Sequence, residues 1–357
     1  MKASIACAVF FISALGVLSF AGASEQEYTY KAGHESLQVW LMPKQVPAPE
    51  NNKLSDERVA LGKMLFFDTR LSGDGNMSCA TCHNPLFGWS DGLRTAKGFK
   101  SKVLPRSTPT IINTAYNPFQ MWDGHLDSLE AQAIGPMLNS NEMNIALDQA
   151  IEFLTTSPDY QKAFSKAYPN EEISVDTLAK AIASFERTVV SRNSPFDRWV
   201  AGDKKALNKQ QVQGFELFVR ADKGNCAVCH SAPNFTDNGF HNVGLDSFYK
   251  NDPDLGRYSV KPIGIMKGAF KTPTLRDISL TAPYFHDGSA STLSEVVEHY
   301  AEENSHKENL SPNMKSIKLS DEETLAIVEF MKALSSPQQP FLLPILSNPE
   351  DGYVSNK

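Results

Sequence analysis

The pattern Cys-x-x-Cys-His occurs twice in this chain of 357 residues, at positions 79–83 and again at positions 226–230. It is the attachment sequence for a c-type haem, in which two thiols form thioethers with the porphyrin and the adjacent histidine binds the iron. We therefore expect two covalently bound c-type haems. The residues expected to hold them are Cys79, Cys82 and His83 for the first haem, and Cys226, Cys229 and His230 for the second.

A zinc site or a redox thiol pair would also use paired cysteines, so both alternatives have to be weighed. The two pairs are separated by 143 residues, whereas the ligands of one zinc ion must come together. The fifth cysteine, Cys7, lies in a segment that we expect to be removed. Every cysteine of the mature chain then belongs to one of the two motifs, which leaves none for a structural disulfide and favours haem attachment.

Residues 1–23 have the features of a secretory signal peptide. Lys2 provides a positive start, an apolar run covers residues 5–20, and the small residues 21–23 form a cleavage site. A membrane anchor is the alternative, but the run is short for a span and is interrupted by serine and glycine. We therefore expect cleavage, export to the periplasm and no membrane span in the mature chain.

The charge of the chain limits its partners. The formal net charge is −7, and cleavage would remove Lys2 and no acid, which gives −8. An acidic surface argues against nucleic acid and favours a small substrate or a basic protein partner.

The two halves of the chain follow one plan of helix, haem motif and closing helix. The segment GKMLF at 62–66 precedes the first motif, and the similar GFELF at 214–218 precedes the second. Apolar residues at helical spacing close each half, and no alternating pattern is long enough for a sheet. We predict an all-α fold of two tandem cytochrome c-like domains. The predicted segments are a signal peptide (1–23), an N-terminal extension (24–54), an N-terminal cytochrome c domain (55–200), a C-terminal cytochrome c domain (201–345) and a tail (346–357).

Local signals place parts of this plan more closely. Ser55 is expected to cap the first helix, and Ser320 with Glu323 to form a capping box for the last one. Residues 40–42 are expected to pack on the body of the protein. Two long loops rich in proline and glycine, 88–118 and 246–273, are expected to shape access to iron or a partner surface.

Several stretches, in order along residues 40–345, resemble the bacterial di-haem cytochrome c peroxidase family. The resemblance implies that the N-terminal domain is peroxidatic, that the C-terminal domain transfers electrons, and that the substrate is hydrogen peroxide. The stretches that carry it are residues 67–72, 79–83, 105–110, 117–124, 240–244 and 281–288.

The resemblance also implies roles for three residues. Trp122 matches a tryptophan between the two haems that relays electrons, and Gln132 and Glu142 match a polar pair on the open side of the first haem. Glu142 would move a proton between the peroxide oxygens as the O–O bond breaks. Taken singly, a core tryptophan, a polar residue on a helix surface and a solvated loop acid are the simpler interpretations. The family spacing of ten residues at each step favours the functional roles.

One departure from the family concerns the first iron. Many members have a histidine six residues before the proline that matches Pro105, and this histidine closes the iron in the resting oxidised protein. Phe99 stands there in this chain, and no histidine lies between His83 and His125. We therefore expect the first iron to be open without reductive activation.

The second departure concerns the far side of the second iron. The usual peroxidases have an axial methionine where this chain has Tyr300, and an axial tyrosine resembles the MauG-type branch of the family. A phenolate is an anionic ligand that favours high oxidation states of iron. Met314 is the main rival for this position, and Met266 is a weaker one.

Calcium between the domains is a further implication of the family. Its backbone ligands match Thr281 and Pro283, but Ser107 replaces the usual asparagine and is a weaker ligand. Gly224 stands where the MauG-type branch has a tryptophan that passes electrons to a protein substrate, which weakens that activity here.

The sequence thus predicts a di-haem peroxidase that takes electrons from a small cytochrome c or a cupredoxin. A MauG-type oxidase that uses peroxide or oxygen on a protein substrate is the first alternative, and a non-catalytic di-haem electron carrier is the second. Because members of the family are often dimeric, a homodimer is also considered.

Overall fold

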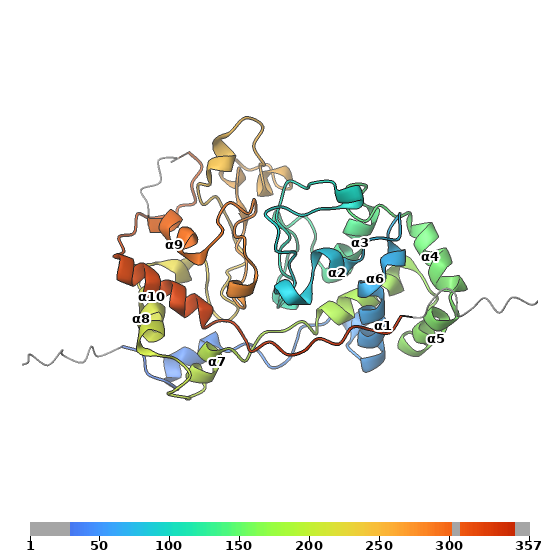
Figure 1. Cartoon of the computed structure of the whole chain (residues 1–357), viewed down its shortest axis with the longest axis horizontal. Coiled ribbons are helices and arrows are strands. Elements are labelled where there is room, and N and C mark those ends of the chain that lie inside the picture. The colour runs from blue at the N-terminus through green and yellow to red at the C-terminus, as the bar shows by residue number, and fades with distance from the viewer. Residues whose placement is uncertain (1–28, 302–307, 347–357) are drawn as a thin grey trace, which may run out of the picture.

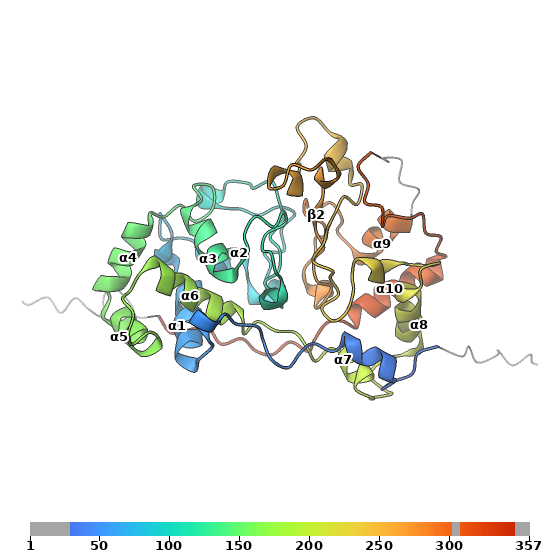
Figure 2. The same cartoon turned by 180° about the vertical axis from the view of Figure 1, so that it is seen from behind.

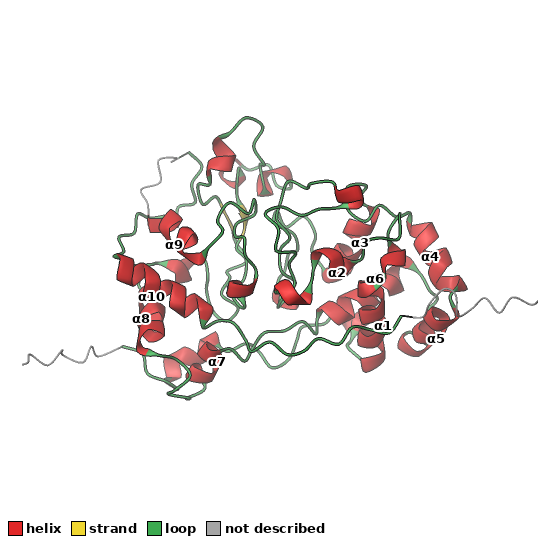
Figure 3. Ribbon diagram, in the orientation of Figure 1, coloured by secondary structure: helices red, strands yellow, loops and turns green. Residues whose placement is uncertain are grey.

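The computed structural model describes residues 29–301 and 308–346, so the predicted signal peptide and all but the first residue of the predicted tail lie outside the described residues. Figure 1 shows two helical lobes, and Figure 3 shows that the region between them consists of long loops. In the described ranges, regular strands are limited to β1 (Phe240–His241) and β2 (Phe270–Lys271), which pair antiparallel. The predicted all-α class is confirmed.

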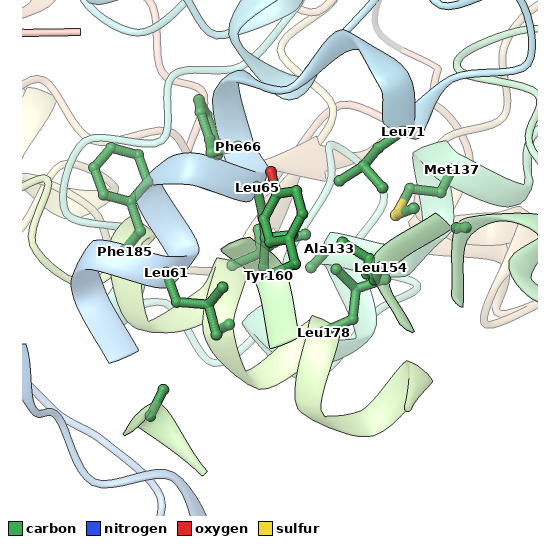
Figure 4. Packing of buried hydrophobic residues seen from close by; sticks show 14 of the residues in the cluster. Leu61, Leu65, Phe66, Leu71, Ala133, Met137, Leu154, Tyr160, Leu178 and Phe185 are labelled. Atoms are coloured by element: carbon green, nitrogen blue, oxygen red, sulfur yellow. The ribbon is translucent and has the colours of Figure 1, made fainter. Parts of the chain in front are cut away.

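The first lobe is built on the packing of α1 (Asp56–Phe67) against α6 (Val175–Glu186). Ser55 caps α1 as predicted, because its side chain accepts a hydrogen bond of 3.3 Å from the backbone N–H of Arg58. The hydrophobic core formed where these helices meet is shown in Figure 4.

The second lobe repeats this packing with α8 (Lys209–Val219) and α10 (Asp321–Lys332). The predicted capping box of α10 is present. Ser320 accepts from the backbone N–H of Glu323 at 3.2 Å, and the Glu323 carboxylate accepts from the backbone N–H of Ser320 at 3.0 Å. The remaining helices are α2 (Cys79–Cys82), α3 (Leu129–Leu138), α4 (Leu147–Thr156) and α5 (Pro158–Ala167) in the first lobe, and α7 (Pro195–Val200) and α9 (Leu293–Ala301) in the second.

A glycine lies at each helix crossing. A Cβ on Gly62 would overlap the backbone carbonyl of Ala181 in α6, and a Cβ on Gly214 would overlap that of Ala326 in α10. The similarity between residues 62–66 and 214–218 therefore has a packing cause: both segments present a glycine so that the two backbones can approach closely.

The chain passes between the lobes in extended stretches that run along one edge of the molecule in Figures 1 and 2. After α6, Val189 still packs in the first core, whereas Phe196 of α7 packs in the second. After α10 the chain returns, and Phe341 packs against the first core. Each lobe therefore contains residues that are distant in the sequence.

The N-terminal lead-in is anchored on the second lobe. Trp40 is 8% exposed, and its ring lies edge-on to those of Phe196 and Phe215, with centroid distances of 6.2 and 5.6 Å. Arg276 donates a hydrogen bond to the Trp40 carbonyl at 2.8 Å. The predicted packing of this segment on the body is confirmed for Trp40. Across the described ranges, every helix is too short or too polar to cross a membrane.

Candidate functional site

The first haem motif forms α2 and the residue that follows it. Thr81 closes a capping box, since its hydroxyl accepts from the backbone N–H of Ser78 at 2.9 Å. His83 is the C-cap residue, and its Nδ1 lies 3.2 Å from the carbonyl oxygen of Trp89. A Nδ1–H that donates to this carbonyl leaves the Nε2 lone pair free, as an iron ligand requires.

The second motif begins with a single 3-10 turn over Cys226–Val228. The backbone N–H of His230 donates to the Cys226 carbonyl at 2.8 Å, and His230 Nδ1 lies 2.9 Å from the carbonyl oxygen of Phe235. The same tautomer as in His83 is therefore favoured. Burial lowers the pKa of both imidazoles, which keeps them neutral and able to bind a metal.

The two motifs open onto one continuous cavity that is lined by both His83 and His230. Its wall near the second motif is largely apolar, with Phe218, Ile327 and Met331 among the lining residues. None of the four motif cysteines is in a disulfide. Paired cysteines outside any disulfide, a neutral histidine with an oriented ring and an apolar wall fit a covalent porphyrin at each motif.

Trp122 lines the cavity together with the two histidines. Its indole N–H donates to the Ser107 carbonyl at 2.9 Å, and its own carbonyl accepts from the backbone N–H of Lys271 at 2.8 Å. Lys271 belongs to the second lobe, so the hydrogen bonds of Trp122 reach both lobes. The indole is held by its hydrogen bond to Ser107, and the backbone of Trp122 is held by Lys271.

Arginines fix the residues next to Trp122. Arg106 forms ion pairs with Asp123 at 2.7 Å and with Asp254 at 2.6 Å. Arg257 donates to the carbonyl oxygens of Asp123 and Gly124 at 2.8 and 2.6 Å. Because Asp254 and Arg257 come from the loop of the second lobe that the sequence marks as long and rich in turns, this loop joins the two lobes at Trp122.

A second, smaller cavity adjoins the first motif. Gln132 of α3 and Glu142 in the loop after α3 both line it, beside Cys79 and Cys82. Asn139 donates to Glu142 at 2.8 Å, and burial raises the pKa of the Glu142 carboxyl. The structure therefore brings a carboxyl group of raised pKa and an amide together next to the first attachment site.

Phe99 lines neither cavity. Its backbone N–H donates to the carbonyl of Asn141 at 3.0 Å, and a Cβ on Gly98 would overlap the same carbonyl. The next histidine along the chain, His125, is paired with Asp123 at 2.6 Å, with its side chain 44% exposed. No histidine of the loop 88–118 can reach the first motif, because this loop contains none.

Tyr300 of α9 lines the large cavity with His230, and burial raises the pKa of its phenol. Met314 lines the same cavity, whereas Met266 does not. Geometry thus leaves Tyr300 and Met314 as candidates for the second iron. The neighbouring His299 is half-buried, and its Nε2 lies 2.8 Å from the Val243 carbonyl oxygen.

The residues expected for calcium offer a weak set of ligands. Ser107, Thr281 and Pro283 all line the large cavity. The Ser107 hydroxyl donates to the Phe285 carbonyl at 2.8 Å, and none of the three side chains carries a charge. Calcium prefers several oxygen ligands that include carboxylates, so calcium stays a prediction and no function is derived from it.

One residue beside the small cavity, Glu186, was not predicted from the sequence. Glu186 ends α6, is 2% exposed, and lines the cavity together with Gln132 and Glu142. The helix pattern could have indicated it, since Glu186 lies four residues after Ile182 and three before Val189, both on the buried face. An acidic residue on the apolar face of a helix is unusual, and this pattern in the sequence could have indicated a functional residue.

Known proteins resemble this chain over most of its length. Residues 56–205 match the model of the family described as di-haem cytochrome c peroxidase, and residues 211–335 match that of cytochrome c. The chain is 44% identical over 305 residues to the methylamine utilization protein MauG of Methylorubrum extorquens, covering 85% of each chain. It is 37% identical over 308 residues to cytochrome c551 peroxidase of Nitrosomonas europaea, covering 86% of this chain and 87% of the relative.

Among solved structures, a MauG-like protein associated with microbial copper homeostasis superimposes with a TM-score of 0.76. It is 29% identical, and the match covers 83% of this chain and 95% of that chain. The two-lobed arrangement is therefore shared with a protein of low sequence identity.

Proposed function

The chain belongs to the di-haem cytochrome c peroxidase family, and on that premise we propose that it reduces hydrogen peroxide to water at the first haem site, with electrons from a small redox protein. It is an oxidoreductase that acts on peroxide, and its cofactors are two covalently bound c-type haems. The residue roles, the electron donor and the location given below are parts of the proposal.

The observation that carries the proposal is the small cavity beside Cys79 and Cys82, which Gln132 and Glu142 both line. The haem bound at His83 would supply the redox centre at which peroxide is reduced. Glu142 takes a proton from one peroxide oxygen and gives it to the other, so that the leaving oxygen departs as water. Gln132 holds the peroxide by hydrogen bonds from its amide.

The raised pKa of Glu142 supports this role. Burial disfavours its charged form, while the hydrogen bond from Asn139 favours it. A carboxylate whose pKa is raised is a stronger base than an ordinary surface carboxylate, so it accepts the proton of peroxide more readily.

The second lobe receives electrons in this proposal. His230 and Tyr300 bind the second iron, with Met314 as the rival of Tyr300, and Trp122 couples the two sites. Trp122 lines the cavity with both proximal histidines and is hydrogen-bonded to both lobes, which supports a relay of fixed geometry.

We further propose that the protein works in the periplasm after cleavage of residues 1–23. Its partner is a small cytochrome c or a cupredoxin, and a basic partner surface would suit the net charge of −8 that follows cleavage. A homodimer is the oligomeric state to test first.

A MauG-type oxidase acting on a protein substrate is the second candidate, because a relative named as a methylamine utilization protein is 44% identical. Gly224 argues against it. A Cβ at this position would come within 2.8 Å of the Leu217 carbonyl oxygen and 3.2 Å of Cys226 Sγ, so a tryptophan there would require the backbone to move. The neighbours of position 224 therefore leave room for a glycine but not for a larger residue.

Steady-state reduction of peroxide by a reduced cytochrome tests the proposal. We expect fast turnover by the wild type and a loss of about 100-fold or more in kcat for E142Q, because one acid–base group contributes about 10²–10⁴-fold. E152Q, at an exposed position of α4, is the matched control and should keep wild-type kcat. Wild-type turnover that is slow with reduced cytochromes but fast on a protein side chain would instead favour the MauG-type activity.

Ligand binding separates both enzymes from an electron carrier. Cyanide should bind to one haem of the oxidised protein and not to the other. If neither haem bound cyanide or carbon monoxide, both irons would be closed by protein ligands and the peroxidase proposal would fail.

A further inference from the structure

Glu186 is a buried acid beside the peroxide cavity to which no role has been given. It is the last residue of α6, is 2% exposed, and lines the small cavity with Glu142, Gln132 and Cys79. Its Oε2 is fully buried and has no hydrogen-bond partner in the described part of the chain. A carboxyl oxygen without a partner, next to a cavity for a polar substrate, points to a function.

The nearest cation does not neutralise Glu186. The guanidinium of Arg187 donates to both carboxylate oxygens of Glu130 on α3, at 2.9 and 3.0 Å. Glu130 also accepts from the side-chain amide of Asn52 at 2.8 Å. Arg187 Nη1 and Nη2 are therefore taken by Glu130, and Arg187 Nε is buried without a hydrogen-bond partner among the described residues, so Arg187 does not hydrogen-bond to Glu186.

The elements packed around Glu186 do not supply another cation. On α1, Lys63 lies 4.4 Å from the centre of the Phe341 ring, and Arg58 donates to the Ala167 carbonyl at 3.2 Å. The nearest group on α2 is Cys79, which carries no charge once it forms a thioether. The charges that act on Glu186 are thus Arg187 and Glu130, while Glu142 lines the same cavity.

These surroundings decide the protonation state of Glu186. Burial and, to a smaller extent, Glu130 raise its pKa to about 8, against the opposing effect of Arg187. The group is therefore mostly protonated at neutral pH and loses its proton as the pH rises through about 8. A neutral carboxylic acid is a proton donor, whereas a glutamine of the same shape would fill the space without one.

We propose that Glu186 is a second proton donor of the peroxide cavity, which supplies a proton that Glu142 cannot. The reaction consumes hydrogen peroxide, two electrons and two protons and releases two water molecules. Glu142 only moves a proton from one peroxide oxygen to the other, so both additional protons must enter the cavity. The O–H bond of Glu186 breaks, a bond forms from its proton to a product oxygen, and Glu186 regains a proton from solvent. This inference rests on the proposed peroxidase function.

The test compares E186Q with the exposed control E152Q in the haem-loaded protein. The first readout uses no peroxide: infrared spectra of the oxidised protein are recorded from about pH 6 to about pH 10, and the C=O stretch of the protonated acid is followed. The second readout is kcat at saturating peroxide over the same range. The haem content and visible spectrum of each variant show that it has folded and loaded.

We expect an acid band that disappears near pH 8 in the wild type and in E152Q and is missing in E186Q. We also expect kcat of E186Q to fall about 100-fold at neutral pH and to lose the decline above pH 8 that the wild type shows. E186D, which keeps the acid, should recover part of the rate.

Other results would overturn the inference. An E186Q variant with the wild-type acid band would show that Glu186 is ionised. An E186Q variant without the band but with wild-type kcat and pH profile would show that its proton is not used. A wild type that does not reduce peroxide would overturn the proposed function and this role together, whereas the first two results leave the function standing.

Discussion

At the scale of single residues, the buried ion pair of Arg276 and Asp197 ties the second lobe together. Their side chains are 0% and 4% exposed, and Arg276 Nη1 donates to both Asp197 oxygens at 2.9 and 3.0 Å. The other end of the guanidinium donates to the carbonyls of Trp40 and Pro233. Asp197 also accepts from the N–H and hydroxyl of Ser194 at the start of α7. One pair thus joins the lead-in, α7 and the loop after the second motif.

We expect D197A to destabilise the protein by about 3–5 kcal/mol, because it leaves the Arg276 charge buried without its partner. Chemical denaturation of the haem-loaded protein, followed by tryptophan fluorescence, measures this loss. D222A is the control, since Asp222 pairs with Arg220 on the surface and its removal should not change stability measurably. Equal stability of D197A and D222A would contradict the importance given to the buried pair.

The same scale shows what the sequence could reveal of the site. The motif alone points to Cys79, His83 and their counterparts, since haem attachment depends on adjacent residues. The family spacing points to Gln132 and Glu142, and the structure brings both to one cavity. The spacing of apolar residues in α6 marks Glu186 as a buried acid, but its role could not be predicted, because that role depends on the contact of α6 with the loop after α3.

At the scale of elements, short-range signals were sufficient for the helix ends that were predicted. Ser55 and Ser320 each accept a hydrogen bond from the backbone N–H three residues later. This cap is local, so it does not depend on the rest of the fold. Helices α3 to α5 were not predicted. Pro136 lies inside α3, and α4 and α5 are separated by Ser157 alone. In the structure α3 packs against α6, α5 against α1, and α4 against α5.

We expect G62A to cost at least about 1–3 kcal/mol, because its Cβ would overlap the backbone carbonyl of Ala181 and the two helices would have to separate. G135A is the matched control within another helix of the same lobe. A Cβ there meets only the Leu126 side chain, at 3.5 Å, so the better helix propensity of alanine should leave stability unchanged or raise it by up to about 1 kcal/mol.

Thermal unfolding of both variants measures the difference. A G62A protein as stable as G135A would mean that the close crossing of α1 and α6 is not required. G214A tests the equivalent crossing in the second lobe and should behave like G62A.

At the scale of the whole molecule, the lobes are joined by the arginine contacts around Trp122 as well as by the chain. Arg106 of the first lobe holds Asp123 of the first lobe and Asp254 of the second. The backbone N–H of Ser107 donates to the His286 carbonyl at 2.7 Å. These contacts could not be predicted from the sequence, because their partners lie 148 and 179 residues apart.

We expect R106Q to weaken the contact between the two lobes at Trp122 and to reduce kcat for peroxide by about 10-fold or more. A small displacement of Trp122 relative to the two haem sites would slow the passage of electrons between them. Cyanide binding to the first haem should stay unchanged, because no ligand of that site is touched. R220Q, which breaks a pair within one lobe, is the control. Unchanged turnover in R106Q would show that the contacts at Trp122 do not limit electron passage.

The return of the chain to the first lobe has a consequence for the order of assembly. Phe341 stacks on Phe67 at a ring distance of 5.3 Å and contacts Trp89 and Phe185 edge-on. A ribosome delivers this ring only after both cysteine pairs have been synthesised. The aromatic cluster of the N-terminal lobe therefore stays incomplete until the chain has been synthesised past Phe341.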